Sequence, residues 1–273
     1  MPEGDTVWLT AHKLHGALGG GLLTRTDFRL PELATADLSG RTVTEVVAHG
    51  KHILLRTNDG LTMHSHLMMD GSWTASRNGK RLFGSSHPAH HLRVVLETAE
   101  VIAQGHRIHD VRIVSTTRES ELVGHLGPDL LGSDWDSSVA ATRLLSTPDR
   151  MIGPALLDQR NLAGIGNLYK CELLFLRGVS PWATVGSVPN IPAMTDLAYR
   201  LLRTNRDRWE QVTTGNNRPG QQTWVYERGS KPCRRCGTPI RRADQHEPDK
   251  GRLGDPHARS TYWCPHCQPG PSP

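Results

Sequence analysis

The alternation of apolar and polar residues divides the chain into stretches with different periodicity. Near the start, Val7, Ala11, Leu14 and Leu18 recur at helical spacing, and the run of glycines that follows ends the predicted helix. From residue 20 to about 130 the chain consists of short runs rich in β-branched residues, such as KHILLRT, HLRVVLE and VRIVS, separated by turn signals such as NDG and RNGK. This pattern predicts an antiparallel β-sandwich or barrel that carries the N-terminal helix.

The second half of the chain changes from strand to helix periodicity. HLGPDLLGSDWD breaks the strand pattern and has the character of an interdomain linker. Helices are then predicted between about 136 and 215, in SSVAATRLL, IGPALLDQ, NLYKCELLFLRG and MTDLAYRLLRTNRDRW. After about 221, short strands return around a group of cysteines. We therefore expect an α+β multidomain protein with domains at 1–130, 131–220 and 221–273.

Composition limits the classes of protein to which the chain can belong. With 273 residues, of which 36% are hydrophobic, it can form a large core, and no apolar run approaches the about 20 residues that span a bilayer. The terminus has neither the basic nor the apolar region of a signal peptide. A net charge of +5 and a pI near 9.1 fit an anionic partner such as nucleic acid, although many ordinary enzymes carry a similar charge.

The cysteines carry the most specific local signal. Cys171 lies in the apolar run CELLFL, which predicts a buried small hydrophobic side chain. The other four form two CxxC pairs: Cys233, Cys236, Cys264 and Cys267. Four thiolates on two turns can form the closed tetrahedron of one structural Zn²⁺, while disulfides or chance spacing are the alternatives. The polar stretch between the pairs, 244–258, is predicted to be a loop at the tip of a zinc hairpin.

Three further features are ambiguous when each is taken alone. Asn167 opens a helix after LAGIG, which suits a phosphate at a helix N-terminus but is equally a tight turn between helices. Lys51 begins an apolar strand, where a lysine is usually a solvated edge charge. The PEG that follows the first methionine is either a meaningless frayed end or a functional group.

Taken together and in order, PEG, GKHILL, LLDQRNLAGIGNLYKCELLF and RSTYWCPHCQ resemble the formamidopyrimidine-DNA glycosylase/endonuclease VIII family over nearly the whole chain. The resemblance implies an N-terminal antiparallel β-sandwich that carries catalysis, a helix–two-turn–helix DNA-binding domain and a C-terminal β-hairpin zinc finger. It also implies a base-excision-repair DNA glycosylase with AP lyase activity, whose partner is DNA with oxidised bases or abasic sites.

The family's catalytic positions fall on four residues of this sequence. The resemblance makes Pro2 the nucleophile, because its secondary amine, once Met1 is removed, can form a cationic Schiff base at the sugar C1′. It makes Glu3 the proton donor that assists sugar-ring opening and base departure. Lys51 corresponds to a proton donor and phosphate contact in β-elimination, and Arg259, on the zinc finger, to the residue assigned to δ-elimination.

The resemblance also suggests DNA contacts. Asn167 matches a phosphate contact, and His125 in HLGPDL lies where relatives often carry another. When the damaged base leaves the stack, its space must be filled. HSHLMMDGSW occupies the void-filling position, so Met68, Met69 and Asp70 are the candidates. The alternative is that these methionines pack in the core.

Two departures from the family pattern bear on substrate choice. In purine-type enzymes an Arg-Phe pair on a second loop helps to fill the gap. The corresponding stretch here is expected to be HDVRIVS, with Ile113 and Val114 in its place, which favours the endonuclease VIII branch and oxidised pyrimidines. Glu227 stands where relatives commonly have glycine, so the lesion-side loop is expected to differ.

Two other functions remain open on the sequence alone, a purine-type glycosylase and a catalytically silent binder of damaged DNA. For the enzyme we expect a monomer in the reducing cytoplasm, associated with the nucleoid and not with a membrane.

Overall fold

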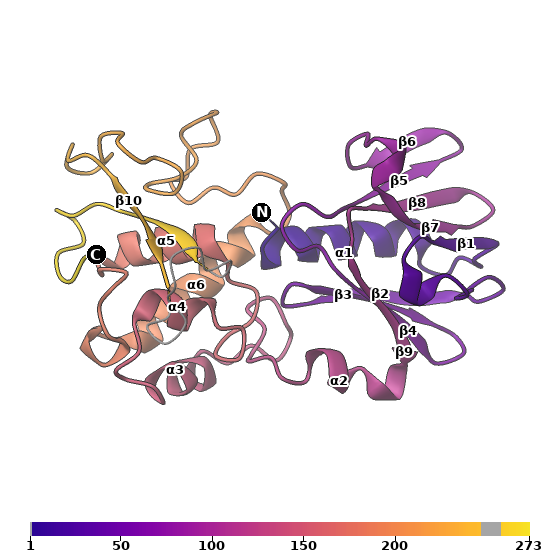
Figure 1. The fold of residues 1–273 in the computed structure, drawn as a ribbon, viewed down its shortest axis with the longest axis horizontal. Helices are drawn as coiled ribbons and strands as arrows, with labels where there is room; N and C mark the ends of the chain where they lie inside the picture. Colours follow the sequence, from indigo (N-terminus) through magenta and orange to yellow (C-terminus); the bar gives the residue numbers. More distant parts are fainter. Residues whose placement is uncertain (1, 247–257) are drawn as a thin grey trace. The chain divides into compact units, whose positions relative to one another are not determined.

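The protein divides into two compact units, Met1–His125 and Leu126–Pro273 (Figure 1). The structure is a computed structural model that describes residues 2–246 and 258–273. The expected boundary near residue 130 lies close to the division between the units. The finer boundary at 220 stays a prediction. Among the described residues, none of the helices has the length and apolar character needed to cross a bilayer.

The first unit begins with the predicted helix, α1 (Gly4–Leu18). The residues that gave its periodicity, Val7, Ala11, Leu14 and Leu18, are all buried. The chain leaves the helix through a glycine with a left-handed backbone, Gly20 with φ 75°, a conformation that glycine adopts at little cost. The sequence pattern therefore located both the helix and its end.

Nine strands form two antiparallel sheets in this unit. One sheet has the order β1-β7-β8-β5-β6 and the other β2-β3-β4-β9. The strands are β1 (Arg25–Phe28), β2 (Val43–His49), β3 (His52–Thr57), β4 (Leu61–His66), β5 (Ser72–Arg77), β6 (Lys80–Phe83), β7 (Leu92–Glu97), β8 (Val101–His106) and β9 (Asp110–Ser115). Short helical turns connect some of them: η1 (Pro31–Leu33), η2 (Ala89–His91), η3 (Thr116–Arg118) and α2 (Ser120–Val123). The predicted antiparallel sandwich is confirmed.

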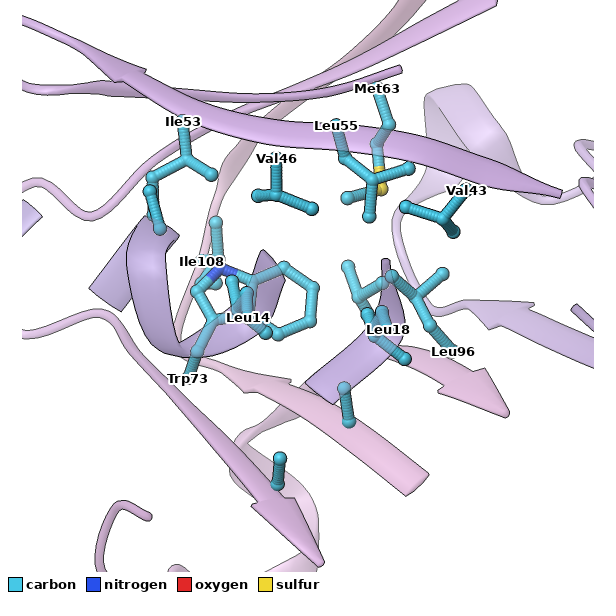
Figure 2. Packing of buried hydrophobic residues seen from close by; sticks show 14 of the residues in the cluster. Leu14, Leu18, Val43, Val46, Ile53, Leu55, Met63, Trp73, Leu96 and Ile108 are labelled. Carbon is cyan, nitrogen blue, oxygen red and sulfur yellow. The ribbon is translucent and has the colours of Figure 1, made fainter. Parts of the chain in front are cut away.

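Helix α1 is part of the core of this sandwich. It contacts β2 and β3 of one sheet and β5 and β8 of the other. Leu14 and Leu18 lie among side chains from both sheets, including Ile53 and Trp73 (Figure 2). Burial of this much apolar surface fixes the helix, and with it the residues at its N-terminus.

The second unit combines helices with a C-terminal hairpin. Its elements are α3 (Ser137–Leu145), α4 (Ile152–Leu157), α5 (Asn167–Arg177), η4 (Val185–Ser187), α6 (Ile191–Asn205), β10 (Arg241–Gln245) and β11 (Arg259–Trp263). Asp136 caps α3 by accepting from the backbone N–H groups of Ser138 and Val139. Gly178, with φ 67°, ends α5. The helices predicted after residue 136 are thus confirmed, but the last of them ends at Asn205, and residues 206–215 are not helical.

Helix α5 packs directly on the hairpin. Cys171 and Phe175 of α5 form a small core with Val225, Ile240 and Cys264, so the prediction that Cys171 is a buried hydrophobic side chain is confirmed. In the hairpin, Gln245 pairs with Arg259. Residues 244 and 245 therefore belong to β10 and not to the predicted loop 244–258, most of which, 247–257, lies outside the described residues.

Candidate active site

The N-terminus of α1 places the proposed nucleophile and acid next to each other. Glu3 is the N-cap residue of α1, in an extended conformation, and its carbonyl oxygen accepts the Val7 N–H at 2.9 Å. Its side chain is buried, at 1% exposure. Pro2, directly before it, is half-buried. The helix thus anchors both residues, and a buried carboxyl beside a proline nitrogen that becomes an amine on removal of Met1 would have the composition of an acid–nucleophile pair.

Lys51 lies in the tight connection between β2 and β3. His49 and His52 are the last paired residues of these strands, and Gly50 takes the left-handed backbone that the turn requires, with φ 58°. Burial lowers the pKa of His66 at the end of β4, the Asp110 carboxylate opposes that shift, and the Lys51 charge adds to it. Lys51 is half-buried and is not simply a solvated edge charge.

Next to Lys51 lies a histidine cluster that the sequence interpretation missed, made of His52, His64, His66 and His125. Nδ1 of His52 lies 2.7 Å from Nε2 of His64. The His52 ring also meets His66 edge-on, with ring centroids 4.8 Å apart, and His125 at 6.4 Å. Strand alternation could have revealed part of this cluster, because His52 pairs with His66 across β3 and β4, and His64 shares their face.

Burial keeps two members of this cluster, His52 and His64, neutral. Desolvation, followed by repulsion from the neighbouring histidines, lowers the pKa of His52 to about 3. Desolvation also lowers the pKa of His64 to about 4, although the Asp110 carboxylate opposes that shift. Both rings therefore carry no charge near pH 7.

The methionines of the predicted void-filling loop are exposed. Met68 and Met69 retain 52% and 58% of their surface. The core-packing alternative is therefore wrong for both side chains. Met68 has a left-handed backbone, with φ 52°, which is uncommon for a residue with a side chain. Asp70 accepts from Nη1 of Arg107 at 2.8 Å.

The expected second void-filling loop is placed wrongly by the sequence interpretation. Ile113 and Val114 are strand residues of β9, paired with Met63 and Thr62 of β4. Ile113 also packs against the sandwich core. The β-branched run VRIVS forms a strand because such side chains fit a pleated, half-buried surface. The turn between β8 and β9 is instead residues 107–109, so this loop does not support the choice of branch.

In the second unit, Asn167 and Arg259 are brought close together. Asn167 begins α5, is 5% exposed, and its Nδ2 donates to the Ser260 carbonyl oxygen at 2.8 Å. Ser260 follows Arg259 in β11. Nearby, the buried Lys170 donates to Oγ1 of Thr261 at 2.7 Å. These two hydrogen bonds therefore tie the start of α5 to β11, the strand that carries Arg259.

A buried carboxylate organises the segment between α6 and the first CxxC pair. Glu172 of α5 accepts the backbone N–H groups of Trp224, Val225 and Tyr226 at 2.7, 2.8 and 2.8 Å. Burial raises the pKa of Glu172, and these hydrogen bonds oppose the shift. The next residue along, Glu227, has φ 55°. That left-handed backbone suits glycine, the residue that the family resemblance leads one to expect at this position.

The four paired cysteines converge on one point. Their Sγ atoms all lie within 4.8 Å of one another, with Cys233–Cys267 at 3.9 Å and Cys236–Cys264 at 3.5 Å. Zinc–sulfur bonds of about 2.3 Å in a tetrahedron give Sγ–Sγ separations of about 3.8 Å, so the cluster fits a metal, and it is too open for S–S bonds of about 2.05 Å. The backbone N–H groups of Arg235 and Cys267 point at Sγ of Cys233 and Cys264, both at 3.4 Å.

Comparison with known proteins identifies the chain. Residues 1–117 match the family model described as formamidopyrimidine-DNA glycosylase N-terminal domain, and residues 126–195 match the formamidopyrimidine-DNA glycosylase H2TH domain. Fold, cysteine hairpin and matched domains define a bifunctional DNA glycosylase and abasic-site lyase. The chain belongs to the formamidopyrimidine-DNA glycosylase/endonuclease VIII family, on the endonuclease VIII branch.

Its relatives cover the whole chain. "Probable endonuclease 8 2" of Streptomyces coelicolor is 53% identical over 100% of this chain and 96% of the relative. "DNA-(apurinic or apyrimidinic site) lyase Nei2" of Mycolicibacterium smegmatis is 45% identical over 98% and 99%. A Lactococcus lactis Fpg crystallised with DNA containing an abasic site has a TM-score of 0.79, with 20% identity over 98% of this chain and 100% of that one. The predicted family and fold are confirmed.

The histidine cluster predicts an acid-sensitive N-terminal unit. The unfolded chain binds protons near pH 6.5, whereas native His52 and His64 do not until about pH 3 and 4. The stability that these neutral rings contribute is therefore complete above about pH 6.5 and falls as the pH decreases towards 4. Urea unfolding between pH 7.5 and 4.5 should show this fall, with a smaller slope in His64→Asn. The exposed His109→Asn serves as the control and should retain the wild-type slope. Equal slopes in all three proteins would contradict the assignment.

Proposed function

We propose that the chain performs base excision through Pro2, removing oxidised bases, chiefly pyrimidines, and then cutting the strand by β,δ-elimination. The observation that carries this proposal is the pairing of Pro2 with the buried carboxyl of Glu3 at the anchored start of α1. The preference for pyrimidines rests on the endonuclease VIII branch to which the relatives point.

The proposed chemistry starts once Met1 has been removed. The Pro2 nitrogen forms a bond to the sugar C1′ as the glycosidic bond breaks, and the base leaves with the proton that this nitrogen releases. Glu3 supplies a proton to the ring oxygen, which opens the sugar and leaves a cationic iminium on Pro2. That charge acidifies the C2′ proton, and its loss expels the 3′ phosphate. Lys51 acts as proton donor and phosphate contact, and Arg259 assists the second elimination.

DNA contacts are proposed in both units. Asn167 begins α5 and is hydrogen-bonded to the strand that carries Arg259, so both residues lie by a helix N-terminus, where a phosphate is favoured. His125, the exposed member of the histidine cluster, is a further contact. Met68 and Met69 fill the space that the flipped base leaves. Methionine packs well but cannot hydrogen-bond the orphaned base, so discrimination of the opposite base should be weak.

The cysteine cluster is proposed to hold one structural Zn²⁺. Four sulfur donors leave no open coordination position, so the metal would stabilise the hairpin that carries Arg259 and take no part in the reaction. Free thiols also suit a reducing compartment, which supports a cytoplasmic location on the DNA. The monomeric state stays a prediction.

Borohydride added during turnover should link Pro2 covalently to DNA that contains an oxidised pyrimidine or an abasic site. Pro2→Gly should weaken or redirect this trapping. Glu3→Gln should lower base release about 100-fold or more, the usual contribution of a positioned acid, while trapping on a preformed abasic site is largely retained. Peptide mapping of the adduct identifies the residue. Undiminished trapping on a lysine, or full activity with an intact N-terminal tag, would exclude the terminal nucleophile.

The methionine pair should matter more on duplex than on single-stranded DNA, because less stacking must be replaced in a single strand. The double variant Met68→Ala/Met69→Ala is therefore expected to lose activity mainly on duplex, and this is measured with a panel of oxidised purines and pyrimidines in both contexts. Equal loss in both contexts would assign these side chains to the fold or the pocket. Preference for oxidised purines would favour the purine-type alternative.

Removal of the metal should unfold the residues from about 221 onward, since structural zinc contributes on the order of 10 kcal/mol in finger peptides. Cys236→Ser and strong chelation should both lower DNA affinity and zinc content. Cys171→Ala, which leaves all four paired cysteines, should retain about one zinc per chain. Elemental analysis that finds well under one zinc per chain in active protein would refute the zinc assignment.

A further inference from the structure

We propose that Arg107 is a positioning residue for the methionine loop, by which we mean residues 67–71. Through its ion pair with Asp70 it would hold Met68 and Met69 in the orientation in which they enter the duplex. This inference rests on the proposed function, because it assumes that Met68 and Met69 enter the duplex when the base is flipped out. The sequence interpretation had not selected Arg107, since it placed the second loop in β9.

One half of the methionine loop is fixed by the backbone and by His66. The Gly71 N–H donates to the Leu67 carbonyl oxygen at 2.8 Å, which closes a tight turn. A Cβ atom at Gly71 would lie 2.5 Å from that oxygen, so the turn requires glycine. The Met68 N–H donates to Nδ1 of His66 at 3.0 Å. The uncommon left-handed backbone of Met68 is thus held from the β4 side.

The other half is held by Arg107. Its Nη1 donates to Oδ2 of Asp70 at 2.8 Å, and its Nη2 lies 2.7 Å from Nε2 of His91. Its backbone N–H donates to the His91 carbonyl oxygen at 2.8 Å, and its φ of 52° is left-handed. The planar guanidinium therefore joins three segments: the β8–β9 turn, the end of η2 and the methionine loop.

Because the Arg107–Asp70 ion pair is exposed, its effect on the orientation of the methionine loop can be distinguished from an effect on the free energy of unfolding. The Arg107 and Asp70 side chains are 42% and 54% exposed, and such pairs add little to the free energy of unfolding. A wedge, however, depends on orientation, because apolar side chains that must enter a base stack gain from being ordered beforehand. Loss of the pair should therefore change wedge-dependent activity more than stability, and high salt should weaken its effect.

The test combines a double-variant cycle with methionine spectroscopy on the full-length, zinc-loaded protein. The variants are Arg107→Gln, Asp70→Asn and both together, with Arg77→Gln as the matched control. Arg77 also forms an exposed ion pair, with Glu100, but at the opposite end of β5 from the methionine loop. Each variant is assayed on the same lesion in duplex and in single-stranded DNA.

We expect each single variant to lose about fivefold on duplex, the upper range for an exposed charge pair, and to lose nothing on single strands. The double variant should be no worse than either single variant, because both remove the same interaction. Additive losses, equal losses in both DNA contexts, or a similar loss in Arg77→Gln would overturn the proposal.

Carbon-13 methyl spectra of the methionines give a readout that does not depend on turnover. The Met68 and Met69 methyl signals should narrow and shift in Arg107→Gln and in Asp70→Asn, whereas the buried Met63 signal should not change. Unchanged Met68 and Met69 signals would refute the positioning role even if the protein is active. A wild-type protein that cuts no lesion would instead refute the proposed function, and the spectra would still decide whether Arg107 orders the loop.

Discussion

The burial of helix α1 inside the β-sandwich is the constraint on which the rest of the first unit depends. Leu14 and Leu18 pack among side chains of both sheets, so the helix cannot shift without opening the core. Pro2 and Glu3 precede its first turn, and the Glu3 carbonyl is already part of the helical hydrogen bonding. A chain terminus that would otherwise fray is thereby held like the residues of the core.

In the second unit, polar contacts hold the proposed functional residues in position. Helix α5 carries Asn167 at its first position and reaches β11 through the Asn167–Ser260 and Lys170–Thr261 hydrogen bonds, while Glu172 holds the segment before the cysteines. One helix thus fixes both the proposed phosphate contact and the strand of Arg259. Because these groups are buried, removal of one partner would leave the other unsatisfied, which is costly.

The sequence predicted the elements and the family well, because helix periodicity, strand alternation and paired cysteines are local signals. It failed where the outcome depends on pairing between distant strands. Ile113 was assigned to a loop although its β-branched run forms β9, and Arg107 was overlooked for the same reason. The histidine cluster was missed because His52 and His64 meet only after β3 and β4 pair in one register. The exposure of Met68 likewise depends on a turn that periodicity does not encode.

The histidine cluster also bears on the chemistry proposed for Lys51. Four histidines near a lysine would, if charged, repel its ammonium group and disfavour the protonated state that a phosphate contact needs. Burial prevents this for His52 and His64, whose pKa values lie near 3 and 4. Burial, together with the Lys51 charge, lowers the pKa of His66 and so favours the neutral ring, whose Nδ1 accepts the Met68 N–H. The same electrostatic balance therefore supports the cation proposed to bind phosphate and the hydrogen bond that holds one side of the methionine loop.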